Sequence, residues 1–379
     1  ANQIICNIDR IKEADPSMTD QECRQWKSEA ILLKAYALFQ MSQIWGDIPV
    51  ENALPPAITE DNVEEVYPLY YPERTSRADV YAQLIEDLTF ACQYAPDVNH
   101  SDKYLLSKAF AHGLLARVYA EKTAQDWNKV IEHCEAVEAM GFKLVDNYGD
   151  MWGYTASDAN RNTTESIFEV AWTDQSQGHW IWMMYHRNAY NPNDSYSWIK
   201  WITPSRSLIA AYKAEGDTER AEASIVYDEA GWSNYYPAEK YAFMHKCPTN
   251  VSSIILMRLG EIYLLHAEAL AMTGDLAKAT EYVNIIRNRA GIKEYTADFA
   301  SQDQAIEKIL HERRLELAFE GFRFWDLVRH DKIKEVHDRM PQEDPYWQTR
   351  RPMTDATILM PIPQSVLDNN PRLTQNDGY

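Results

Sequence analysis

The sequence predicts a mostly α-helical fold, namely a tetratricopeptide-like scaffold of helical hairpins with long irregular loops and a few short strands. Apolar residues recur at helical spacing over several long segments. Two pairs of these segments meet at short turns, as in helical-hairpin repeats. The stretch between the two pairs has no helical period and is rich in aromatic residues, Asn and Gly. Residues 1–379 are therefore expected to form a single domain with three regions.

The first region, residues 19–140, is expected to contain the N-terminal helical hairpins. The first helix begins at Thr19, where Glu22 lies three residues further on and completes a capping box. The last helix ends at Gly141, which suits the left-handed backbone of a C-terminal cap. A helix is predicted over residues 19–45, a loop over 51–74 and a second helix over 76–94. A helical hairpin is predicted over residues 105–123 and 127–140.

The second region, residues 141–253, is predicted to be variable, irregular and ligand-binding. Apolar alternation predicts one short strand over residues 166–172, with Phe168, Val170 and Trp172 on one face. Extended loops are then expected over residues 173–205, one helix over 205–214 and a second irregular stretch over 215–253.

The third region, residues 254–379, is predicted to hold the C-terminal helical hairpins and a Pro-rich tail. Its clearest feature is a turn at Gly274 and Asp275 between two periodic segments. A helical hairpin is expected over residues 254–273 and 275–289. A pair of helices broken near Gly321 is expected over residues 302–337, and an irregular tail over residues 341–379.

The composition limits the class of protein. The net charge is −20, from 57 acidic and 37 basic residues, which argues against a nucleic acid partner. No apolar run approaches the roughly 20 residues that a membrane-spanning helix needs. The five cysteines are scattered and form no CxxC pair or metal-type spacing, so neither a disulfide framework nor a metal site is predicted. No signal peptide is recognisable at Ala1.

Sequence motifs for catalysis are missing. No GxSxG, Walker A or GxGxxG motif occurs. His311 and Glu312 begin like the zinc motif HExxH, but Leu315 stands where the second histidine belongs. A calcium-loop pattern fails at Thr163, which replaces the required glycine. Its other positions are Asp158, Asn160, Asn162 and Glu169. The sequence therefore contains none of these catalytic motifs, and no cofactor is predicted.

Charged residues recur at helical spacing near residue 320. They are Glu312, Arg313, Glu316, Glu320, Arg323, Asp326 and Arg329. They could form a binding patch or a partly buried ion-pair network. Opposite signs recur at i,i+3 and i,i+4 and aromatic residues lie between them, which favours the network.

The aromatic residues supply the candidate ligand site. The chain has 12 Trp and 23 Tyr, and many of them gather in the non-periodic stretch. The candidate ligand-binding residues are Trp180, Trp182, Tyr185, Tyr190, Tyr196 and Trp198, with Asn188, Asn191 and Asn193 as polar partners. Exposed aromatic rings suit the apolar C–H face of a sugar. The alternative is that these rings pack a long loop onto the body of the protein.

Several ordered motifs resemble one family. The segment Arg258–Leu270 leads into Gly274 and Asp275, and the segments 284–291, 312–323 and 326–329 follow. The tail then contains Pro361–Pro363, Asn370–Pro371 and Gln375–Tyr379. Earlier, the segment Glu29–Pro49 fits the N-terminal half of the same pattern. This series resembles the SusD/RagB family of Bacteroidetes outer-membrane nutrient-binding lipoproteins.

The resemblance implies a SusD-like fold and a role in nutrient uptake. Such proteins are anchored by a lipid at the extracellular face of the outer membrane. They capture a glycan, or in some members a peptide, and deliver it to a SusC-like TonB-dependent transporter without breaking bonds. Because Cys6 lacks a preceding lipobox, the resemblance places the lipidated N-terminal cysteine outside these residues. A purely structural repeat scaffold and a hydrolase are the alternatives from other functional classes.

Overall fold

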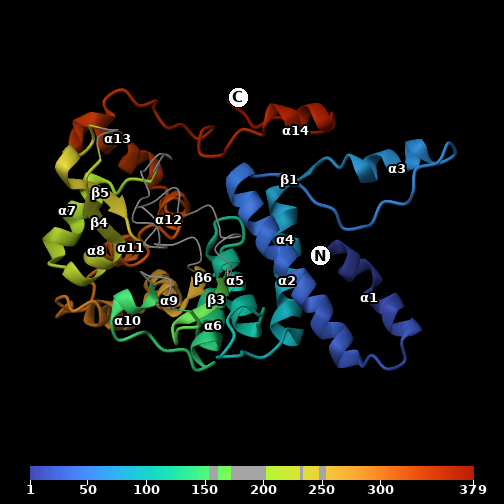
Figure 1. Cartoon of the computed structure of the whole chain (residues 1–379), viewed down its shortest axis with the longest axis horizontal. Helices are drawn as coiled ribbons and strands as arrows, with labels where there is room; N and C mark the ends of the chain where they lie inside the picture. Colours follow the sequence, from blue (N-terminus) through green and yellow to red (C-terminus); the bar gives the residue numbers. More distant parts are fainter. Residues whose placement is uncertain (153–160, 172–201, 231–233, 247–252) are drawn as a thin grey trace. The chain divides into compact units, whose positions relative to one another are not determined.

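The computed structural model describes residues 1–152, 161–171, 202–230, 234–246 and 253–379 (Figure 1). These residues are mostly helical and fall into two compact units. Unit 1 contains residues 1–98, 106–133 and 352–379, and unit 2 contains residues 99–105 and 134–351. No helix in the described ranges has both the length and the apolar character that crossing a membrane requires.

Unit 1 is built around the long helix α2. Thr19 caps this helix through the predicted capping box, because its hydroxyl accepts a hydrogen bond from the Glu22 amide and the Glu22 side chain accepts one from the Thr19 amide. Helix α4 lies alongside α2 and also packs against α5 (Figure 1). The elements of this unit are α1 (Asn2–Ala14), α2 (Asp20–Trp45), β1 (Ile48–Pro49), α3 (Val63–Tyr70), β2 (Arg74–Thr75), α4 (Arg77–Tyr94), α5 (Lys108–Ala120) and α14 (Gln364–Asn369).

Two parts of unit 1 differ from the prediction. The segment 51–74 was expected to be a loop because it is rich in Pro and acidic residues, but it contains helix α3. Glu64 and Glu65 occupy the first turn of α3, where negative charge favours a helix start. The tail was expected to be irregular, and its part in this unit is irregular apart from the short helix α14. The helices predicted over 19–45 and 76–94 are confirmed by α2 and α4.

Helix α6 (Trp127–Glu138) begins in unit 1 and continues into unit 2. The other elements of unit 2 are η1 (Tyr148–Met151), β3 (Ser166–Val170), α7 (Arg206–Glu215), α8 (Thr218–Ser224), β4 (Ile225–Asp228), η4 (Ala238–Lys240), β5 (Tyr241–Met244), β6 (Ile254–Arg258), α9 (Leu259–Thr273), α10 (Leu276–Arg289), α11 (Gln302–Glu316), α12 (Arg323–Arg329), α13 (Ile333–Glu343) and η5 (Pro345–Trp347). The strand predicted near 166–172 is confirmed by β3, and the helix predicted over 205–214 by α7.

The predicted C-terminal hairpin is formed by α9 and α10, and α11 packs against both helices. Gly274 ends α9 in the left-handed region, at φ +94°, where a residue with a Cβ would be strained. Asp275 then caps α10 by accepting a hydrogen bond from the Lys278 amide at 3.1 Å.

Three predictions within unit 2 are wrong in detail. Residues 254–258 form strand β6, not the start of a helix, and this strand pairs antiparallel with β3. Its short apolar run is compatible with either structure, and pairing with β3 decides between them. The segment 215–253 was expected to be irregular, but α8 and the antiparallel pair of β4 and β5 lie within it. The predicted pair of helices over 302–337 is in fact three, α11 to α13.

Candidate functional site

The predicted ligand-binding residues lie outside the described residues. Trp180, Trp182, Tyr185, Asn188, Tyr190, Asn191, Asn193, Tyr196 and Trp198 all belong to the segment 172–201. The description resumes at Ile202, four residues before helix α7. Residues 202–206 are therefore the described part of the chain that follows the predicted site.

The chain that follows the predicted site is fixed by three tyrosines of unit 2. The Tyr236 hydroxyl donates a hydrogen bond to the Pro204 carbonyl oxygen at 2.8 Å. The Arg206 amide donates to the Tyr235 hydroxyl at 3.1 Å. The hydroxyls of Thr203 and Tyr241 lie 3.3 Å apart. Residues 203–206 are therefore held by tyrosines from the β4–β5 connection and from β5.

Arg206, Tyr235 and Asp344 form a polar joint at the start of α7. Arg206 Nη1 lies 2.7 Å from Asp344 Oδ1, and the Tyr235 hydroxyl donates to Asp344 Oδ2 at 2.9 Å. The Arg206 guanidinium also lies over the Tyr235 ring, 4.4 Å from its centroid. Burial, and secondarily the hydrogen bond to Asp344, raises the pKa of Tyr235 above its ordinary value. The joint therefore holds Arg206 and the Tyr235 ring in place.

Tyr235 also belongs to a group of four aromatic side chains, here named the aromatic cluster: Tyr235, Tyr236, Tyr346 and Trp347. The ring centroids of Tyr235 and Tyr346 are 4.7 Å apart in an edge-to-face arrangement, and those of Tyr346 and Trp347 are 5.4 Å apart. Tyr235 is buried, Trp347 is half-buried, and Tyr346 is 47% exposed. The cluster thus offers a solvent-facing aromatic surface on a fixed base.

Sequence reasoning did not select these four residues. They form two adjacent aromatic pairs that are more than 100 positions apart in the chain. The available signal was that each pair stands in a segment without helical period, as the residues of the predicted site do. What the sequence could not give is that η5 lies against the β4–β5 connection.

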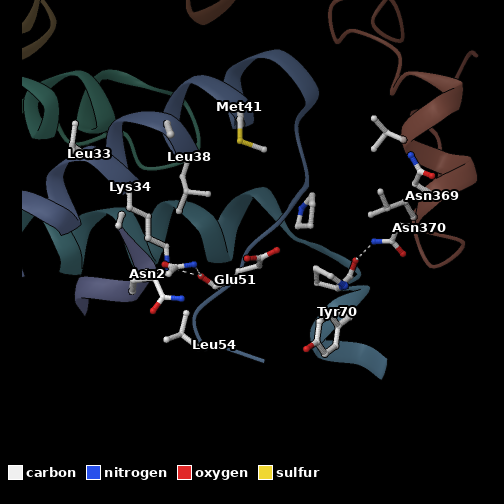
Figure 2. A pocket seen from close by; sticks show the side chains of 17 residues that line it. Asn2, Leu33, Lys34, Leu38, Met41, Glu51, Leu54, Tyr70, Asn369 and Asn370 are labelled. Carbon is white, nitrogen blue, oxygen red and sulfur yellow. Dashed lines mark hydrogen bonds between the residues drawn. The ribbon is translucent and has the colours of Figure 1, made fainter. Parts of the chain in front are cut away.

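Unit 1 contains a separate hollow with a volume of about 870 Å³ (Figure 2). Leu33, Leu38 and Met41 of α2 form part of its wall, and residues of α14 and of the chain just after it form another part. Several of its polar groups are already engaged within the protein. The Lys34 ammonium donates to the Glu51 carbonyl at 2.6 Å, and the Asn370 amide donates to the Pro72 carbonyl at 2.9 Å. Tyr70 is the one aromatic residue among those that line it, so the hollow suits a sugar ring less well than the aromatic cluster does.

The charged pattern near residue 320 forms a buried ion-pair network in unit 2, as predicted. Glu316 lies at its centre and pairs with Arg220, Arg258 and Arg289. Burial alone would raise the pKa of the Glu316 carboxyl, but Arg289, Arg258 and Arg220 hold that pKa well below its ordinary value. Because these side chains are almost completely buried, the network belongs to the scaffold and is closed to a soluble ligand.

Two family models match the chain. Residues 2–120 match a model described as "Starch-binding associating with outer membrane", and residues 232–379 match the SusD family. The description of the first model names starch binding and the outer membrane.

Relatives and solved structures match the chain over nearly its whole length. Two SusD-like proteins of Formosa agariphila are 24% and 25% identical, over 94% and 100% of this chain and 74% and 78% of their own lengths. A surface glycan-binding protein A from Bacteroides fluxus has a TM-score of 0.76 at 24% identity, covering 100% of this chain and 83% of that one. A laminarin-binding SusD-like protein has a TM-score of 0.73 at 24% identity, covering 98% and 83%. The chain belongs to the SusD/RagB family.

Proposed function

We propose that this protein captures a glycan at the extracellular face of the outer membrane, where a lipid anchor holds it. It then delivers the glycan to a SusC-like TonB-dependent transporter and breaks no bond in doing so. Membership of the SusD/RagB family supports the role, and the matches to a starch-binding family model and to a laminarin-binding structural neighbour support a glycan as the ligand.

The observation that carries the choice of site is the aromatic cluster, which contacts Pro204 and Arg206 in the chain that follows the segment 172–201. Tyr235 and Tyr236 are fixed by their bonds to Arg206 and Pro204, which follow the predicted aromatic residues in the chain, and Tyr346 next to Tyr235 is exposed. A glycan chain needs several stacking surfaces in succession, because each sugar ring contributes only a small binding energy. We place the ligand on the predicted site together with Tyr346 and Trp347.

The proposed contacts follow from the chemistry of a sugar ring. The axial C–H bonds present an apolar, slightly positive face that stacks on the negative face of Tyr or Trp. The hydroxyls at the ring edge need hydrogen-bonding partners, which the amides of Asn188, Asn191 and Asn193 would supply. The Arg206–Asp344 pair holds the aromatic cluster in position and need not touch the ligand itself.

Calorimetric titration with soluble glycans tests the site, beginning with laminarin and starch fragments. The variant Tyr346→Ala/Trp347→Ala should weaken binding at least about tenfold, since stacking on an aromatic ring is commonly worth more than ~1 kcal/mol. The variant Trp180→Ala/Trp182→Ala/Trp198→Ala should weaken binding at least as much. Trp26→Ala is the matched control, because Trp26 is an exposed tryptophan of α2 outside the cluster. Unchanged affinity in both multiple variants would refute the site.

A peptide is the second candidate ligand, and the net charge of −20 favours it. An acidic surface attracts basic peptides through the long-range field of the protein. Binding to a basic peptide mixture that weakens steeply with added salt, combined with no glycan binding, would establish this alternative. The delivery step needs its own test, namely co-purification of the tagged protein with an outer-membrane transporter from the native cells.

A further inference from the structure

Three helices bring a thiol and two imidazoles together in unit 1. Cys92 lies in the last turn of α4, His112 lies in α5, and His133 lies in α6. One ligand atom from each side chain lies within 4.8 Å of the other two. Intervals of 20 and 21 residues separate the three along the chain (112 − 92 and 133 − 112), so no local motif announces them.

The two histidines of this group are in close contact. Their Nδ1 atoms are 2.9 Å apart, and their rings meet at an angle of 50°. The ring of His133 also stacks on Tyr119, with a centroid separation of 5.8 Å and an interplanar angle of 8°. His133 is therefore fixed from two sides, and its Nδ1 faces His112.

We propose that Cys92, His112 and His133 form a metal site for Zn²⁺ or a closely related d-block cation. One thiolate and two imidazoles are among the donor sets that proteins use for zinc, with the fourth position left to water or to another ligand. The proposal replaces the expectation of no metal site, which rested on local sequence spacing.

The dimensions of the group suit a tetrahedral ion after a small adjustment. Two imidazole nitrogens on one zinc ion are about 3.3 Å apart, as tetrahedral angles and Zn–N bonds of about 2.0–2.1 Å require. The Nδ1 atoms must therefore separate by a few tenths of an ångström, which modest rotation of the half-buried His112 ring provides. A direct hydrogen bond between the two histidines explains their spacing without a metal, but it gives the nearby thiol no role.

The position of the group determines how a metal ion could reach it and what binding would do to the protein. Cys92 and His112 are half-buried, so an ion can enter from solvent, whereas His133 is buried. The bound ion would link α4, α5 and α6, because each of these helices supplies one of its three ligands. A ligand that binds only the folded state stabilises that state, so zinc should raise the thermal unfolding temperature of the full chain.

Metal titration of the chelator-stripped full chain tests the proposal. Zn²⁺ in competition with a chromophoric chelator should show one tight site per chain, and Co²⁺ should give a sulfur-to-metal charge-transfer absorption. Cys92→Ser should remove that absorption and weaken zinc binding more than roughly a hundredfold, since even residues that only support metal ligands matter 10–100-fold. Cys6→Ser is the matched control, because Cys6 is an exposed free thiol outside the group.

A second variant guards against a folding defect. His112→Gln removes one nitrogen ligand from a half-buried position and should also abolish the tight site, while circular dichroism shows unchanged helix content. The proposal is overturned if the wild-type chain takes up no stoichiometric zinc. It is also overturned if the folded Cys92→Ser or His112→Gln variant binds zinc as the wild type does.

Discussion

Arg258 Nη1 lies 2.7 Å from Glu316 Oε1, and both side chains are at most 1% exposed. A buried pair of this kind contributes little net stability relative to an apolar pair, but removing one partner leaves a buried charge without compensation. We therefore expect Glu316→Gln to lower the free energy of unfolding by about 3 kcal/mol or more, as measured by urea denaturation. Glu335→Gln is the control, since that exposed carboxylate pairs with Arg339 on the surface of α13. Its loss should cost under about 0.5 kcal/mol, and equal losses in the two variants would contradict the prediction.

Acid should weaken unit 2 through the same carboxylate. The folded-state pKa of Glu316 is lowered from the ordinary value of 4.5. Its contribution to stability is therefore complete above about pH 4.5 and is lost as the pH falls from there toward the folded-state pKa. The unfolding free energy of the wild type should fall more steeply below pH 4.5 than that of Glu316→Gln. Parallel acid profiles for the two proteins would show that Glu316 is not held ionised by its arginines.

Gly260 should resist replacement by alanine. A Cβ at this position would lie 2.5 Å from Arg258 Nη1, 2.8 Å from Glu165 Oε1 and 2.9 Å from Glu316 Oε1. Gly→Ala in an ordinary helix stabilises by about 1 kcal/mol, whereas forced overpacking costs about 1–3 kcal/mol. We expect Gly260→Ala to destabilise the protein in urea denaturation. An increase in stability would mean that the network adjusts to the added methyl group without cost.

The joint between Arg206 and Asp344 should show a measurable coupling. Arg206→Ala, Asp344→Ala and the double variant form a thermodynamic cycle that isolates the pair. Because the Arg206 side chain is 43% exposed, the coupling in urea denaturation should be only about 1 kcal/mol. Glycan affinity should fall in both single variants, since the aromatic cluster loses its fixed base. A coupling near zero with unchanged glycan affinity would show that the joint does not position the cluster.

Local sequence signals predicted the helices well. The capping box of Thr19 and Glu22 marked the start of α2, and Gly274 marked the turn between α9 and α10. These signals succeed because capping and turn formation depend on residues that are close in the chain. Strand β6 was predicted as helix because its apolar run has no period of its own, and its partner β3 lies far away in sequence.

The sites could be predicted only in part. The predicted ligand residues between Trp180 and Trp198 remain a prediction, while the aromatic cluster became visible only through the fold. The group around Cys92 was missed for the same reason, since its members stand on three helices. A site whose residues are brought together only by packing shows no regular spacing in the sequence. The buried charges of α11 and α12, in contrast, repeat at helical spacing and could be recognised.

The buried network also sets an order of events during synthesis. Glu165 Oε1 lies 2.7 Å from Arg258, and Glu165 Oε2 lies 2.8 Å from Arg289. All three residues precede Glu316 in the sequence, so they leave the ribosome before it does. Until Glu316 is available, the Glu165 carboxylate is paired with both the Arg258 and the Arg289 guanidinium groups. The excess positive charge of these two arginines makes their burial unfavourable. Unit 2 should therefore stay open on the ribosome until α11 has emerged, and a nascent chain that ends before Glu316 should remain accessible to protease.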